Sequence, residues 1–173
     1  MQGRLDRAFF RHDVLEVAPG LLGKLLVMND EGRGKAVYTI SETEAYKGGD
    51  DLACHASKGR TGRTDVMFGD GGHIYMYLIY GMYWMLNVVT SSEEVPQAVL
   101  IRALREVSGP GRLTRLIGVD KSYNGEDLVT SPRIGIYESG DGSTPSHTTG
   151  PRIGIDYAGE PWKSMPWRYV MNL

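Results

Sequence analysis

Residues 73–90, His-Ile-Tyr-Met-Tyr-Leu-Ile-Tyr-Gly-Met-Tyr-Trp-Met-Leu-Asn-Val-Val-Thr, contain two runs rich in aromatic and aliphatic side chains. Such runs favour β-strands, and the intervening Tyr80-Gly81-Met82 is short enough to be the turn of a hairpin. A buried strand pair would account for most of these apolar residues. It does not account for the large side chains at the tip, because a hairpin tip is exposed and exposed apolar clusters usually bind something.

Other strands and helices are predicted on both sides of this hairpin. Residues 35–46 and 98–103 have the composition of strands, and residues 110–117 suit a helix that begins at a proline. Residues 6–26 look helical, with Asp13 as a cap and a break at Pro19-Gly20. A second helix is expected to start near Pro19 and to lead through residues 21–26 into a strand.

The motif Pro-Arg-Ile-Gly-Ile occurs twice, at Pro132 and at Pro151, and is interpreted as two similar strands. The chain has 173 residues, which suffices for one domain with a core of its own. Strand patterns outnumber helical ones. We therefore expect a single α+β domain over residues 1–173, with a curved, mostly antiparallel sheet, surrounding helices and a protruding β-hairpin.

The composition narrows the class of protein. A net charge of −2 does not indicate a nucleic-acid binder, but Lys58, Arg60 and Arg63 form one basic cluster within this neutral total. Cys54 is the only cysteine, which excludes an intrachain disulfide and a cysteine-based metal cluster. With neither a membrane-spanning apolar run nor a signal peptide in the sequence, we expect an intracellular, soluble protein.

The segment Glu42-Thr43-Glu44-Ala45-Tyr46 holds two carboxylates on a predicted strand. Residues two apart on a strand face the same side, so Glu42, Glu44 and Tyr46 would share one face. Paired carboxylates can cleave glycosidic bonds, and a single carboxylate can activate water against a bond with a good leaving group. Two solvent-facing strand residues would give the same pattern.

The histidines show no spacing typical of metal ligands. His55 follows the carboxylate strand and could hydrogen-bond or stack on a substrate, although a lone histidine is more often structural. The sequence lacks HExxH and CxxC motifs, a GxSxG motif and a phosphate-binding loop. We therefore expect neither a catalytic metal nor a cofactor.

A tyrosine at the tip of a rigid hairpin could wedge between stacked bases. Minor-groove proteins unstack and kink a duplex with such wedges, and enzymes that flip a base hold it against flat side chains in a pocket. Tyr80 supplies the first kind of surface, and the tyrosines before it supply the second. The hairpin is therefore compatible with a base-flipping enzyme.

Several motifs, in colinear order over nearly the whole chain, resemble the alkyladenine (3-methyladenine) DNA glycosylases of the mammalian type. The motifs are Glu42 to Tyr46, His55, Met67-Phe68, Tyr75 to Asn87, Val99 to Arg102, Gly109 to Leu113, Asp120 to Leu128 and Pro151 to Glu160. Each motif alone is a weak signal, but their agreement is strong.

This resemblance implies a role for each matching residue. Glu44 corresponds to the general base that deprotonates the attacking water, with Arg102 as its partner, and Glu42 becomes a supporting residue. The walls that bind the flipped base would be Tyr46, His55 and Tyr77, and Asn87 would obstruct the 2-amino group of guanine. Tyr80 would be the intercalating wedge, and Met67 a second intercalating contact at the lesion.

The resemblance implies a monomeric, monofunctional enzyme that acts on damaged purines in double-stranded DNA, away from membranes. Two alternatives remain: a non-catalytic binder of damaged DNA, or a glycoside or nucleoside hydrolase that uses Glu42 and Glu44 on small substrates. A pure binder has no need of Glu44, Arg102 and Asn87 together. A small substrate would leave Tyr80 without a role.

Overall fold

The computed structural model describes residues 3–173, which form one α+β domain around a strongly bent antiparallel sheet. Nine strands take part, and six of them follow the order β3-β4-β5-β2-β1-β7. These six are β1 (Leu25–Asp30), β2 (Gly34–Tyr46), β3 (Ile74–Ile79), β4 (Tyr83–Thr90), β5 (Gln97–Leu104) and β7 (Ile134–Tyr137). The predicted fold class is confirmed.

Strand β2 is long enough to join two parts of the sheet. Its first half, residues 34–39, pairs with β1, and its second half, residues 40–46, pairs with β5. Three further short strands complete the sheet: β6 (Val107–Ser108) on β5, and the pair β8 (His147–Gly150) and β9 (Arg168–Met171), of which β9 lies along residues 42–44 of β2. The second half of β2 therefore has a strand on each side.

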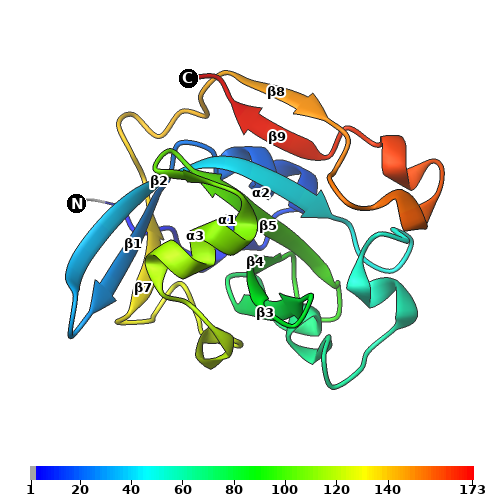
Figure 1. Cartoon of the computed structure of the whole chain (residues 1–173), viewed down its shortest axis with the longest axis horizontal. Coiled ribbons are helices and arrows are strands. Elements are labelled where there is room, and N and C mark those ends of the chain that lie inside the picture. The colour runs from blue at the N-terminus through cyan, green and yellow to red at the C-terminus, as the bar shows by residue number, and fades with distance from the viewer. Residues whose placement is uncertain (1–2) are drawn as a thin grey trace.

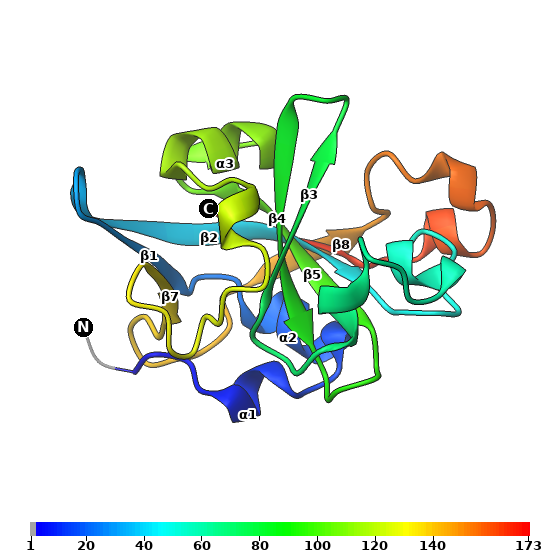
Figure 2. The ribbon, with the colours of Figure 1, turned by 90° about the horizontal axis from the view of Figure 1, so that it is seen from below.

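The helices cover the two sides of the sheet. Helix α2 (Val14–Gly20) packs against β2 and β5, and α3 (Pro110–Ile117) packs against β4 and β5 on the other side of β2 (Figure 2). The short α1 (Arg7–Phe10) precedes α2, and five 3₁₀ turns lie in the connections. These turns are η1 (His55–Lys58), η2 (Asp65–Phe68), η3 (Lys121–Tyr123), η4 (Asp156–Ala158) and η5 (Trp162–Ser164).

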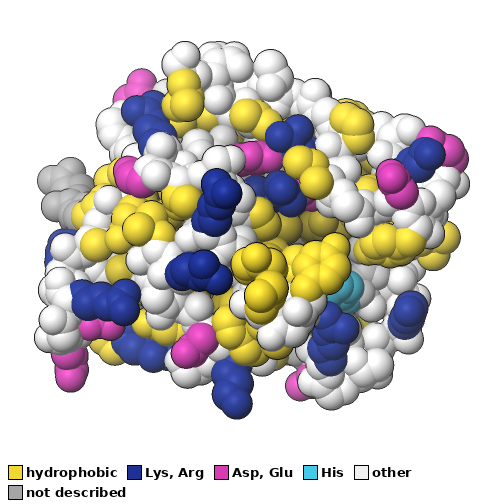
Figure 3. Space-filling view, viewed as in Figure 1, with side chains coloured by type: hydrophobic (Ala, Val, Ile, Leu, Met, Phe, Trp, Pro, Cys, Tyr) yellow, Lys and Arg dark blue, Asp and Glu magenta, His cyan; other side chains and the backbone are white. Residues whose placement is uncertain are grey.

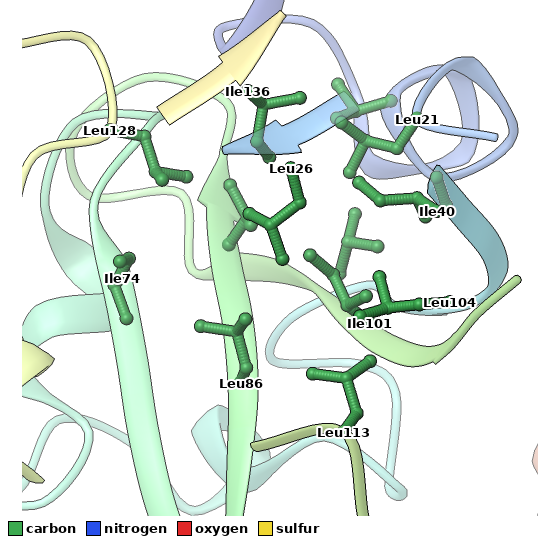
Figure 4. Packing of buried hydrophobic residues seen from close by; sticks show 14 of the residues in the cluster. Leu21, Leu26, Ile40, Ile74, Leu86, Ile101, Leu104, Leu113, Leu128 and Ile136 are labelled. Atoms are coloured by element: carbon green, nitrogen blue, oxygen red, sulfur yellow. The ribbon is translucent and has the colours of Figure 1, made fainter. Parts of the chain in front are cut away.

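The core lies between the sheet and these helices. Leucine and isoleucine side chains from β1, β2, β3, β4, β5, β7 and α3 meet there, among them Leu26, Ile40, Leu86, Ile101 and Leu113 (Figure 4). All five are at most 1% exposed. Burial on this scale stabilises a fold by about 1.5–3 kcal/mol per large aliphatic side chain, which holds the second half of β2 in place.

Of two local predictions for the N-terminal region, one is confirmed and one is wrong. The Asp13 carboxylate accepts a hydrogen bond from the Leu15 amide at 2.9 Å and caps α2, as predicted, and α2 ends at Gly20. The second helix is wrong, because residues 21–23 form a turn, and Leu25 and Leu26 already belong to β1, the strand into which that helix was expected to lead. Hydrogen bonding of β1 to β2 on one edge and to β7 on the other outweighs the local helix propensity of these residues.

The two Pro-Arg-Ile-Gly-Ile motifs take different structures. The first enters β7, but the second, residues 151–155, is not a strand, so that part of the prediction is wrong. Gly154 has φ +75°, a left-handed conformation that turns the chain and ends extended pairing. This turn carries the second motif along the side of β2.

The predicted hairpin is formed by β3 and β4 and projects from the body of the domain (Figure 2); in Figure 1 it points toward the viewer. Tyr80 and Gly81 have φ values of 52° and 65°, and the Met82 amide donates to the Ile79 carbonyl at 3.1 Å. Two successive positive φ values are typical of a type I′ turn, whose twist matches that of the strands. No helix among residues 3–173 is long and apolar enough to cross a membrane.

Candidate active site

A cavity of about 430 Å³ opens beside the hairpin, between β3–β5, η1 and residues 153–157. This volume is within the usual range of about 300–1,000 Å³ for ligand pockets. Seven of the eight residues predicted for the site line it: Tyr46, His55, Met67, Tyr77, Tyr80, Asn87 and Arg102. Hydrophobic side chains gather on this face of the molecule, with Lys and Arg side chains spread around them (Figure 3).

The eighth residue, Glu44, lies directly behind the cavity wall. Its side chain is fully buried, yet each of the three residues that hydrogen-bond or ion-pair with its carboxylate lines the cavity. Oε2 accepts a hydrogen bond from the Tyr46 hydroxyl at 3.0 Å, and Oε1 accepts from the Ile153 amide at 3.2 Å and pairs with Arg102 Nη1 at 2.9 Å. The carboxylate is therefore positioned from β2, from β5 and from the turn of the second repeated motif.

Burial sets the electrostatics of Glu44. Loss of solvent raises the pKa of its carboxyl above 4.5, while Arg102, the Ile153 amide, the Tyr46 hydroxyl and Arg152 oppose that rise. A carboxylate with a raised pKa is a stronger base than an ordinary one and stays ionised above that pKa. The arrangement suits proton abstraction from a water molecule.

Glu42 and Glu44 face the same side of β2, as the alternation predicts. The Arg102 guanidinium contacts both, with Nε 3.3 Å from Glu42 Oε1 and Nη1 2.9 Å from Glu44 Oε1. Glu42, unlike Arg102, is not among the residues that line the cavity. The two carboxylates therefore share one arginine rather than flanking a substrate bond.

Flat side chains form one wall of the cavity. The rings of His55 and Tyr77 meet edge-on, with centroids 4.5 Å apart and planes at 70°, and His55 Nδ1 lies 3.0 Å from the Tyr75 hydroxyl. Burial, with Arg63 and Lys58 nearby, lowers the pKa of His55 to about 4. The imidazole is therefore neutral at pH 7, and the aromatic wall on this side carries no histidine charge.

Asn87 is held rigidly in the cavity wall from β4. It is 3% exposed, and its Nδ2 group donates to the carbonyl oxygens of Tyr75 at 3.2 Å and Met85 at 3.4 Å. Both bonds run to backbone atoms of the hairpin strands. The amide therefore cannot turn away from a group that enters the cavity without losing buried hydrogen bonds.

The two residues predicted to intercalate lie in different environments. Tyr80 at the hairpin tip is 88% exposed and Met82 is 59% exposed. Met67, on η2, is 2% exposed and packs with Tyr75 in a small hydrophobic cluster at the cavity wall. Both residues line the cavity, but Tyr80 is exposed at the hairpin tip whereas Met67 is buried in the cavity wall.

Sequence reasoning missed the support behind Tyr46. The Arg152 guanidinium lies 4.8 Å from the Tyr46 ring centroid, pairs with Asp51 at 2.6 Å and donates to the Ala45 carbonyl at 3.0 Å. Arg152 is 4% exposed. An arginine repeated within an apolar motif was the available signal, because such a residue needs a buried partner.

Among residues 3–173, no group of three or more His, Cys, Asp or Glu side chains is placed to hold a metal ion. The lining of the cavity combines aromatic rings, one amide and one guanidinium over a buried carboxylate. These groups can hold a planar ligand and activate water at one end of it.

Comparison with known proteins identifies matches over the whole domain. The family model for methylpurine-DNA glycosylase (MPG) matches residues 8–108 and 104–173. A protein of Natranaerobius thermophilus is 39% identical over 191 residues, covering 98% of this chain and 96% of the relative. Relatives from Myxococcus xanthus (44% identity, 95% and 88% coverage) and Methanocella arvoryzae (42%, 95% and 90%) are similar. All three carry the name "Putative 3-methyladenine DNA glycosylase".

Proposed function

Because the chain belongs to the methylpurine-DNA glycosylase family, a family of DNA repair glycosylases, we propose that it flips damaged purines out of double-stranded DNA and hydrolyses their N-glycosidic bonds. The observation that carries this proposal is the buried Glu44 carboxylate behind an aromatic cavity, beside an exposed tyrosine on a projecting hairpin. The resemblance to the mammalian type remains a prediction, since the relatives compared are bacterial and archaeal.

In the proposed reaction, Tyr80 enters the duplex as the target base leaves it. Flipping costs a few kcal/mol of lost stacking and pairing, less at a damaged base. Stacking against an aromatic side chain is worth about 1–3 kcal/mol per base, so Tyr80 in the vacated gap offsets much of that cost. Tyr80 is exposed and stands on a turn with its own hydrogen bond, so it can do this without unfolding the hairpin.

The flipped base stacks on Tyr46, Tyr77 and His55. Alkylated purines such as 3-methyladenine carry positive charge, and aromatic faces attract cations. A neutral His55 adds no repulsion to such a base. The wall therefore favours the charged lesions, which are also the better leaving groups.

Glu44 then takes a proton from water, and the oxygen of that water attacks C1′ of the sugar. The C1′–N bond to the base breaks, and its electron pair leaves with the purine. The carboxylate is fully buried, and the residues that bond to it, Tyr46, Arg102 and Ile153, line the cavity, so the attacking water approaches it from the cavity side. We expect a monofunctional hydrolase, since the lining residues include no lysine that could form an imine with the sugar.

A hydrolase of small glycosides or nucleosides is less well supported. That alternative uses Glu42 as the second carboxylate, but Glu42 is paired with arginine and does not line the cavity. A non-catalytic binder of damaged DNA remains the other alternative. Excision of 3-methyladenine, 7-methylguanine, hypoxanthine and ethenoadenine from duplex DNA separates the three functions, because only the proposed glycosylase releases free base.

We expect Asn87→Ala to admit guanine. Removing an amide that two backbone bonds hold in place opens room for the 2-amino group of a normal guanine. The preference for hypoxanthine over guanine, measured as the ratio of single-turnover rates, should fall by about 10- to 200-fold. Asn29→Ala, an exposed residue on β1, is the control. An unchanged ratio in Asn87→Ala would contradict the assigned role.

Binding to duplex DNA should weaken steeply with salt despite the net charge of −2. Arg112 and Arg115 are exposed on α3, whose first residue, Pro110, lines the cavity. Arg112→Ala should reduce the slope of log affinity against log salt by about one. Lys35→Ala, an exposed residue on β2 at the far end of the β1–β2 hairpin (Figure 1), should leave the slope unchanged. A flat salt response of the wild type would contradict a phosphate-binding face.

A further inference from the structure

A row of four alternating charges runs from β9 to the buried carboxylate. We call Arg168, Glu42, Arg102 and Glu44 the charge quartet. Arg168 Nε lies 2.5 Å from Glu42 Oε1, the same oxygen that Arg102 Nε approaches at 3.3 Å, and Arg102 continues to Glu44 at 2.9 Å. Two carboxylates and two guanidinium groups make the quartet neutral.

The strand register builds this row. On β2, Glu44 stands directly across from Arg168 on β9, and Glu42 lies two residues back on the same face. Arg168 reaches diagonally to Glu42, and Arg102 reaches Glu44 from β5 on the other edge of β2. The outermost member of the row is the most exposed and the innermost is fully buried: the side chain of Arg168 is 29% exposed, those of Glu42 and Arg102 are 11% and 14% exposed, and that of Glu44 is 0% exposed.

Glu42 competes with Glu44 for Arg102. Both carboxylates bind the same guanidinium, and ionised groups with little solvent need an opposite charge within reach. Glu42 has two arginine partners, and the contact with Arg168 is shorter than the contact with Arg102. Arg168 therefore supplies most of the positive charge that neutralises the Glu42 carboxylate. Without Arg168, a single guanidinium would have to neutralise both carboxylates.

We infer that Arg168 is a positioning residue for the proposed reaction: by binding Glu42, it leaves Arg102 to hold Glu44 ionised and in place. This inference rests on the proposed function for its role in catalysis, but the electrostatic coupling can be measured apart from activity. Arg168 lies 66 positions after Arg102 in the chain and meets it only through Glu42. No role is assigned to Arg168 by the motifs that surround Glu44.

The test is the pKa of Glu44, followed by ¹³C NMR of side-chain carboxyl groups and assigned by its loss in Glu44→Gln. Arg168→Met keeps the apolar stem but leaves the quartet with a net negative charge, so the pKa should rise by about one unit. Glu42→Gln leaves a net positive charge and should lower it. The neutral double variant Glu42→Gln/Arg168→Met should return to the wild-type value, and Arg168→Lys should remain close to it.

Other charged and titratable groups that face Glu44 stay constant across this series. They are Tyr46 on β2, Arg152 in the second repeated motif, Tyr77 on β3 and Tyr157 on η4. Opposite shifts from the two ends of one ion pair cannot come from a general loss of packing. An unchanged Glu44 pKa in Arg168→Met, or shifts of the same sign in Arg168→Met and Glu42→Gln, would overturn the inference.

Activity gives the second readout. At pH values below the Glu44 pKa of both proteins, Arg168→Met should release base about tenfold more slowly than the wild type, because a pKa higher by one unit lowers the ionised fraction of Glu44 about tenfold. At higher pH, where Glu44 is ionised in both proteins, the two rates should be equal. A deficit that is equal at all pH values would overturn the positioning role. A wild type that releases no base from any of the four lesions would overturn the proposed function instead, while the NMR titration would still decide the coupling of Arg168 to Glu44. Melting temperatures of all variants verify that each is folded.

Discussion

Replacing Glu44 with glutamine should leave binding to damaged duplex DNA intact and slow base release by about 10²- to 10⁴-fold, the usual contribution of a general base. Glutamine has the same shape and keeps an oxygen for the Ile153 amide, but it cannot take a proton from water. Arg102 retains Glu42 as an ionic partner, so the variant should fold. Single-turnover release from a duplex with ethenoadenine or hypoxanthine measures the rate, and equilibrium titration measures binding.

The control for this substitution is Glu31→Gln, an exposed residue in the turn between β1 and β2. It changes the net charge equally and should release base at the wild-type rate. Release by Glu44→Gln at that same rate would remove Glu44 from the mechanism. Loss of binding together with release would instead assign the residue to the shape of the cavity.

The pH dependence follows from the same carboxylate. Burial raises the pKa of Glu44, so the catalytic ionised form is lost as pH falls through a value above 4.5. The rate should therefore decline on the acidic side with a limb that Glu44→Gln lacks. A cationic alkylated purine is the suitable substrate, because it needs no proton to leave and any limb then belongs to the protein. A pH-independent rate down to pH 4.5 would contradict the assignment.

Removing the hairpin ring by Tyr80→Ala should slow excision from duplex DNA by about 10- to 100-fold while affecting single strands far less. The expected size corresponds to about 1–3 kcal/mol of stacking, with about 1.4 kcal/mol per factor of ten. Only a duplex has a gap to fill when the base leaves. Because Tyr80 is 88% exposed, its loss creates no cavity in the protein.

Two further substitutions separate the ring from the turn. Tyr80→Phe keeps the ring and should excise at nearly the wild-type rate. Tyr80→Asn suits the positive φ of 52° better than tyrosine does, so it should stabilise the turn while slowing duplex excision as much as alanine. Equal losses on duplex and single strands in Tyr80→Ala would count against the wedge, and rescue by asparagine would show that turn stability was responsible.

Local patterns in the sequence predicted the elements whose residues are stabilised by near neighbours. The β3–β4 hairpin is one such element, because its turn connects strands that pair with each other. Helix α3 is another: it spans residues 110–117 as predicted, beginning at Pro110 and ending before Gly118, which has φ +75°. The shared face of Glu42 and Glu44 follows from strand alternation and is visible in their common contact with Arg102.

Local sequence patterns gave the wrong secondary structure where a segment distant in the sequence determines the conformation. Residues 21–26 are rich enough in leucine for the predicted helix, but residues 21–23 form a turn, and Leu25 and Leu26 lie in β1 between two strands that complete their hydrogen bonds. The second Pro-Arg-Ile-Gly-Ile motif has the composition of the first, yet its backbone turns at Gly154 and donates to Glu44. Identical pentapeptides thus take different structures because their surroundings differ.

The sequence by itself determined the hairpin with its tyrosine tip, the carboxylates on one side of a strand, and the set of residues that resembles a glycosylase. Only the tertiary structure decided what surrounds Glu44: the Ile153 amide comes from 109 residues away, Arg152 comes from the residue before it, and Arg168 comes from still later in the chain. The periodicity of a sequence predicts the face of a strand on which each side chain lies. Periodicity does not predict which other strand will lie beside that strand, because strand pairing depends on how the whole chain buries its apolar surface.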